Sequence, residues 1–155
     1  MQLGNILRKE RERKKITAAD MAARLGLSLE AYNEFESGAS PIEEWGPRLP
    51  QIAIKLSIPT SRLISETGKS AQALLTNGQC GRLVKTHREK RRLSREELAA
   101  LLGWSNDQLA SIEGGDSPLE TYAPLLLRFA ETINQPIFNL FYPCGLPFDT
   151  LQDYP

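Results

Sequence analysis

Residues 17–41 read TAADMAARLGLSLEAYNEFESGASP, and residues 94–118 read SREELAALLGWSNDQLASIEGGDSP. Each stretch opens with a hydroxyl residue followed three positions later by an acidic one, the pattern of a box that caps a helix start. A glycine suited to a left-handed helix end follows, and then a serine suited to cap the next helix. Both stretches therefore predict two short helices joined by a tight turn. The predicted caps are Thr17, Ser28, Ser94 and Ser105, and the predicted ends are Gly26 and Gly103.

The two stretches belong to a longer internal repeat. Residues 3–64 align with residues 80–141 at a constant offset of 77 without a gap, and 18 of the 62 aligned residues are identical. Chance does not keep such a register, so the chain holds two copies of one unit. Apolar residues recur at helical spacing and no segment alternates with a period of two, which predicts an all-α fold. The predicted domains are unit 1 at residues 1–66, a linker at 67–78, unit 2 at 79–142 and an extended tail at 143–155.

Composition excludes several classes of protein. The 155 residues include 19 Lys and Arg against 19 Asp and Glu, and 41% of them are hydrophobic. This composition is globular, and the zero net charge argues against a surface that attracts nucleic acid everywhere. No apolar run has the length of a signal peptide or a membrane span. We therefore expect a cytoplasmic protein.

Site chemistry is equally sparse. Two cysteines and one histidine are too few for a disulfide framework or a histidine-rich metal site. Cys80 occupies the same repeat position as Leu3, which predicts core packing, and His87 is predicted to lie on the surface. No catalytic constellation emerges, so we expect no enzyme, no metal and no cofactor.

The capped helix with its alanine pair, the glycine, the serine cap, and the closing Glu-x-Gly and proline together resemble the Cro/C1-repressor (XRE) helix-turn-helix family. The resemblance covers both copies and implies a tandem duplication of a five-helix, lambda-repressor-like domain. It also implies structural ion pairs between the first helix and the Glu-x-Gly motif. These pairs are Arg11 with Glu36 and Arg88 with Glu113.

One spacing departs from the family in both copies. Ala53 and Ala130 lie twelve residues after Pro41 and Pro118, several residues farther than the family usually has. The added stretch predicts a longer loop or a helical turn before the fourth helix. Its aromatic residues, Trp45 and Tyr122, are expected to pack between the units or on the core.

In this family the third helix enters the major groove of DNA while the second crosses the backbone. Asparagine can pair with adenine and an acidic side chain can accept a hydrogen bond from cytosine, so the third helix of the second copy has side chains that can recognise bases. Arg95 stands where a family member contacts phosphate, whereas the first copy has Ala18 there. The base-facing residues that the resemblance implies are Leu29, Glu30 and Glu34 in the first copy and Asn106, Asp107, Gln108 and Ser111 in the second.

Charge is distributed unevenly around these helices. Residues 28–39 and 105–116 each carry a net charge of −3 without any Lys or Arg, which predicts that the two third helices bind DNA weakly. Residues 8–15 carry +4 and residues 85–95 carry +5. These basic segments are either solvated helix ends that complement the helix dipole or a surface that grips phosphate. The phosphate-facing candidates are Arg95, Lys90, Arg91, Arg92, Lys14 and Lys15.

The sequence thus predicts a DNA-binding transcriptional regulator. Its partner would be an operator-like site on double-stranded DNA, bound by an intramolecular pseudo-dimer or by a homodimer. The alternative is a protein-interaction module whose acidic third helices meet a protein partner, and the apolar Leu29 and Tyr32 favour this alternative. The basic helix ends and Arg95 oppose it. Neither interpretation involves a membrane.

Overall fold

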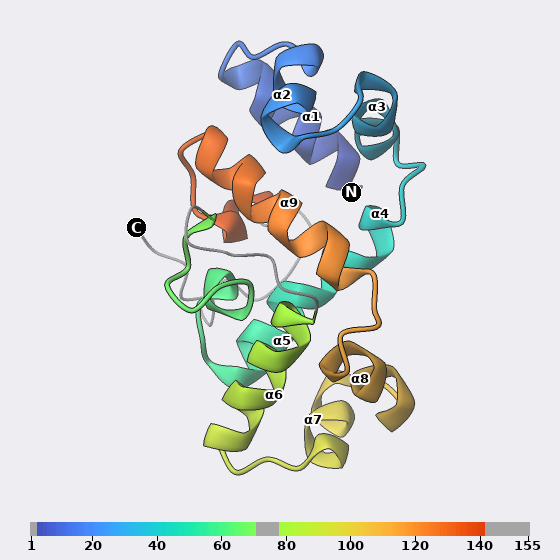
Figure 1. Ribbon diagram of the computed structural model, residues 1–155, viewed down its shortest axis with the longest axis vertical. Coiled ribbons are helices and arrows are strands. Elements are labelled where there is room, and N and C mark those ends of the chain that lie inside the picture. Colours follow the sequence, from blue (N-terminus) through green and yellow to red (C-terminus); the bar gives the residue numbers. More distant parts are fainter. Residues whose placement is uncertain (1–2, 71–77, 142–155) are drawn as a thin grey trace.

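The computed structural model describes residues 3–70 and 78–141, and every regular element within them is a helix (Figure 1). The all-α prediction is therefore confirmed. The predicted tail, and the central part of the predicted linker, lie outside the described residues. The α-helices are α1 (Leu3–Arg13), α2 (Ala18–Leu25), α3 (Leu29–Ser37), α4 (Ile42–Trp45), α5 (Arg48–Leu56), α6 (Gln79–Lys90), α7 (Arg95–Leu102), α8 (Asn106–Glu113) and α9 (Leu119–Thr132), and two short 3₁₀ helices are η1 (Thr60–Leu63) and η3 (Ile137–Leu140).

The connection into the fourth helix differs between the copies. In the first copy the chain forms the short helix α4, passes Gly46 and Pro47, and starts α5. In the second copy α9 runs without a break through Pro124. The expected helical turn is thus a separate short helix in the first copy, whereas in the second copy it forms the first part of α9. Ala123 stands where the first copy has Gly46, and alanine favours a helix over glycine by about 1 kcal/mol.

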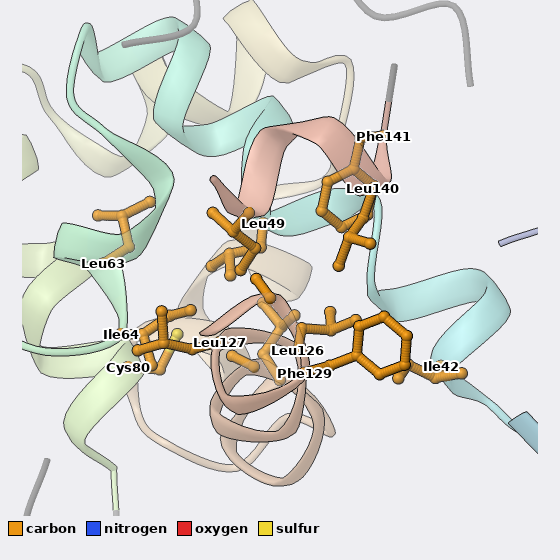
Figure 2. Close-up of a cluster of buried hydrophobic side chains, with 14 of the residues drawn as sticks. Ile42, Leu49, Leu63, Ile64, Cys80, Leu126, Leu127, Phe129, Leu140 and Phe141 are labelled. Carbon is orange, nitrogen blue, oxygen red and sulfur yellow. The ribbon is translucent and has the colours of Figure 1, made fainter. Parts of the chain in front are cut away.

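One apolar core runs through both copies. Figure 2 shows part of it, where Ile42, Leu49 and Ile64 from the first copy gather with Cys80 and Phe129 from the second. All five side chains are buried, which confirms the prediction that Cys80 packs in the core. Because burial removes the thiol from water, it raises the pKa of Cys80.

The two copies exchange their C-terminal elements. We call α1–α3 the first head and α6–α8 the second head, and we call α5 with η1 the first arm and α9 with η3 the second arm. The first arm packs against α6 and α7 of the second head, and the second arm packs against α1 and α2 of the first head, while α9 also contacts α6 of its own head. Figure 1 shows the result: α9 lies beside the first head, and α5 lies next to α6. Each head therefore packs against the other copy's arm, and the second head packs against its own α9 as well.

Candidate nucleic-acid interface

Both heads contain two short helices joined by a tight turn, as expected. The turn residues Gly26 and Gly103 adopt φ angles of 72° and 74°, in the left-handed region that favours glycine. The hydroxyl of Ser28 then accepts a hydrogen bond from the backbone N–H of Ala31, and Ser105 does the same for Gln108. These caps start α3 and α8 immediately after the turn. We call α3 and α8 the reading helices, because each corresponds to the third helix of the family, which enters the major groove.

An arginine–glutamate pair holds each reading helix against the first helix of its head. Arg11 Nε lies 2.6 Å from Glu36 Oε2, and Arg88 Nε lies 2.7 Å from Glu113 Oε2. A second, parallel hydrogen bond joins each pair, so both are bidentate. The pair in the second head is the more deeply buried, because only 1% of the Glu113 side chain is exposed. The hydrogen bond to Glu113 raises the pKa of Arg88.

Two glycines that the sequence analysis did not single out allow these helices to approach. A Cβ atom on Gly4 would lie 2.3 Å from the carbonyl oxygen of Phe35, and one on Gly81 would lie 2.2 Å from that of Ile112. Both contacts are with backbone, which cannot move aside as a side chain can. Glycine is therefore required where α1 meets α3 and where α6 meets α8. The signal available in the sequence was their identity in the repeat.

Two glutamates, also not singled out, cap the first helix of each head. Glu43 accepts hydrogen bonds from the backbone N–H groups of Leu3 and Gly4, and Glu120 accepts them from Cys80 and Gly81. A carboxylate at a helix N-terminus satisfies its unpaired N–H groups and complements its dipole. These glutamates therefore attach the start of each fourth-helix segment to its own head before the arms cross over. They too are identical in the repeat.

The predicted base-facing residues lie on the surface. Leu29, Glu30 and Glu34 of α3 are exposed, and so are Asn106, Asp107, Gln108 and Ser111 of α8. The side-chain carbonyl of Gln108 accepts a hydrogen bond from Ser105 N at 3.1 Å, so the cap of α8 holds this side chain. In Figure 1 α3 and α8 lie on the same side of the molecule, with α4 between them. The two reading helices are thus presented together.

Tyr32 is not part of this exposed surface. Its side chain is fully buried in the core of the first head and contacts Phe35 edge to face at a centroid distance of 6.2 Å. The expectation that Tyr32 offers an apolar surface to a protein partner is therefore wrong. Leu29 retains 46% exposure and remains available.

The predicted phosphate-facing residues divide into two groups. Lys14 and Lys15 follow α1, and Lys90, Arg91 and Arg92 stand at the corresponding end of α6; all five side chains are exposed. Arg95 differs, because its Nε lies 3.4 Å from Glu113 Oε1 and its side chain is only 35% exposed. In Figure 1 the α1–α2 connection lies at the upper left and the α6–α7 connection runs along the bottom, whereas α3 and α8 lie at the right. The cations therefore flank the reading helices rather than share their surface.

His87 is buried, so the prediction of a surface residue is wrong. The charged residues around His87 in the sequence gave no indication of burial, but His87 lies on the inner side of α6, where η1 packs. Burial lowers the pKa of His87, and the nearby cations of Arg91, Lys90 and Arg62 lower it further. Arg62 belongs to the first arm, so the exchange brings it to the basic end of the second head.

No group of histidine, cysteine and carboxylate side chains within residues 3–70 and 78–141 has the arrangement of a metal site. Over the same residues, no helix is both long enough and apolar enough to cross a membrane.

Comparison with protein families gives two matches. Residues 7–43 match a family described as helix-turn-helix, and residues 79–134 match a second family described as helix-turn-helix domain. The first match runs from within α1 into α4, and the second covers the second head together with α9. No curated protein and no solved structure matches the chain.

Proposed function

Since residues 7–43 and 79–134 each match a helix-turn-helix family, we propose that the chain is a DNA-binding transcriptional regulator of the Cro/C1 (XRE) type. The second head is its principal reader. The observation that carries this assignment is the start of α8, where exposed Asn106, Asp107 and Ser111 directly follow the turn. Residues at this end of a reading helix reach base edges in the major groove, and their side chains have the donors and acceptors to read them.

Affinity in this proposal comes from the exposed cations beside the second head. Lys90, Arg91 and Arg92 neutralise phosphates while α8 enters the groove, and Lys14 and Lys15 do so for the first head. The acidic reading helices oppose this attraction. We therefore expect modest affinity with a strong dependence on salt, because each neutralised phosphate releases bound counterions.

The test is fluorescence anisotropy with duplexes selected from a random pool, titrated with salt. The double variant Lys90→Glu and Arg92→Glu should weaken binding to all duplexes and reduce the salt slope by about 2. Lys55→Glu with Lys69→Glu changes the charge equally at exposed positions that belong to neither head, and should have a much smaller effect. Asn106→Ala should reduce the preference for the selected site by about 10-fold while random duplexes bind as before. Absence of binding at low salt refutes the proposal.

A second candidate function applies to the first head. Its reading helix exposes Leu29, Glu30 and Glu34 and has no cation, a surface suited to a basic protein segment. The variant Glu30→Gln with Glu34→Gln separates the two functions. If α3 lies against DNA, neutralising these carboxylates should tighten binding, because like charges no longer face the phosphates. Unchanged DNA affinity favours the protein partner.

A further inference from the structure

Because each head packs against the other copy's arm, we propose that this exchange holds the two heads at one fixed separation, so that they bind DNA as a single unit. Arg48 and Tyr122 are its positioning residues. The inference rests on the proposed DNA-binding function for its consequence, but its structural premise can be tested without DNA.

The first head is completed by α9. Leu7, Leu25 and Phe35 of the first head line a small apolar pocket together with Leu125 and Phe129 of α9. Beside this pocket the ring of Tyr122 meets the ring of Phe35 edge to face, with centroids 6.0 Å apart and planes at 74°. Phe35 lies on the inner side of α3. The second arm therefore supports the reading helix of the first head directly.

The second head packs against α5 of the first copy in addition to its own α9. The guanidinium of Arg48 lies 4.2 Å from the ring centroid of Trp45 and 5.6 Å from that of Trp104. Glu44 holds the other side of this guanidinium at 3.0 Å. Trp104 lies in the turn between α7 and α8, next to the Ser105 cap. Arg48 therefore links the first copy's fourth-helix segment to the turn that directs α8.

These contacts link the heads reciprocally through helices that share one apolar core. A head that rotated alone would have to break the core that it shares with the opposite arm. The two heads should consequently engage two half-sites only at the separation that they span. When geometry forbids simultaneous engagement, the gain from bivalent binding is lost, which is a factor of about 10² or more.

The structural premise is tested by cutting the full chain. A protease site inserted between residues 74 and 75 allows the folded protein to be nicked, and cleavage is followed by gel. We expect the two halves to co-elute in size-exclusion chromatography and to melt in one transition by circular dichroism. Halves that remain together, or that unfold once parted, support the exchange. Halves that separate and melt independently, each cooperatively, overturn it.

The consequence is tested with duplexes that carry two copies of a selected half-site at varied separations. The intact protein should prefer one separation, and a shift of about half a helical turn, roughly 5 base pairs, should weaken binding by about 10². Arg48→Ala and Tyr122→Leu should flatten this dependence, whereas the exposed control Lys55→Ala should keep it. Binding without any preference for separation overturns the inference but leaves the proposed function standing. Absence of binding to every duplex overturns the function itself, and the nicking result still decides the exchange.

Discussion

Arg88→Ala should destabilise the protein strongly, because it leaves a buried carboxylate without its main partner. Arg88 makes two hydrogen bonds to Glu113, at 2.7 and 3.0 Å, and a third to the carbonyl oxygen of Leu93 at 2.8 Å. Only Arg95, at 3.4 Å, would remain near Glu113. Breaking one side of a buried pair typically lowers the free energy of unfolding by about 3–5 kcal/mol. At roughly 2–4 °C per kcal/mol for a chain of this size, Tm should fall by about 6–20 °C.

Urea and thermal denaturation followed by circular dichroism measure this loss. Lys90→Ala is the matched control, since it removes an exposed cation from the same helix and should change stability by less than about 0.5 kcal/mol. Arg11→Ala should cost less than Arg88→Ala, because Glu36 is more accessible to water than Glu113. The double variant Arg88→Met with Glu113→Leu should recover most of the loss, because it leaves no buried charge unpaired. If Arg88→Ala loses less than about 1 kcal/mol, the reasoning that this pair ties α6 to α8 is refuted.

Two further predictions concern groups buried inside the second head. Gly81→Ala should lower the free energy of unfolding by at least about 2 kcal/mol in urea denaturation, because its Cβ would meet the backbone of α8. Gly103→Ala should lose only about 1 kcal/mol from backbone strain, since no atom lies within 4 Å of its Cβ; equal losses would contradict the close-approach argument. His87 is the only histidine, so its NMR titration is unambiguous, and its midpoint should lie below the ordinary 6.5. Because the unfolded chain then binds more protons, this group's stabilisation is present above pH 6.5 and is lost as pH falls through the folded midpoint; a midpoint above 6.5 would contradict its burial.

Local chemistry explains what could be predicted from the sequence. A serine or threonine cap and a left-handed glycine depend only on residues a few positions apart, so Ser28, Ser105, Gly26 and Gly103 identify helix ends directly. The repeat doubled each signal. The cross-copy contact of Tyr122 with Phe35 also confirms that this aromatic residue packs between the units.

Tertiary contacts explain what could not be predicted. His87 lies in a stretch whose other residues are mostly charged, and Tyr32 lies beside exposed acids, so neither neighbourhood indicated burial. The charge and polarity of adjacent residues do not determine which side of a helix faces the core. Gly4, Gly81, Glu43 and Glu120 act across long separations, and only their identity in both copies marked them.

The connection before the fourth helix explains why the arms are exchanged. The two heads have similar apolar surfaces, so either arm finds a suitable face on either head, and burial alone does not choose between them. The connection between head and arm therefore determines which head each arm packs against. Both copies carry extra residues before the fourth helix, and in α4 and in the first turns of α9 those residues are helical. Each added residue advances a helix by about 1.5 Å and turns it by about 100°, so a few of them redirect the face that follows.

The anchoring of these added turns strengthens that choice. Glu43 and Glu120 attach the start of each segment to its own head, and the helix then carries the chain away from that head. Because α9 continues without a break, its helical geometry determines which side of the residues beyond Tyr122 faces the first head. In the first copy the Gly46–Pro47 break allows a change of direction, and Arg48 then secures the arm on Trp104. The departure in spacing from the family is therefore the sequence feature that best accounts for the exchange, and shortening that connection equally in both copies should return each arm to its own head.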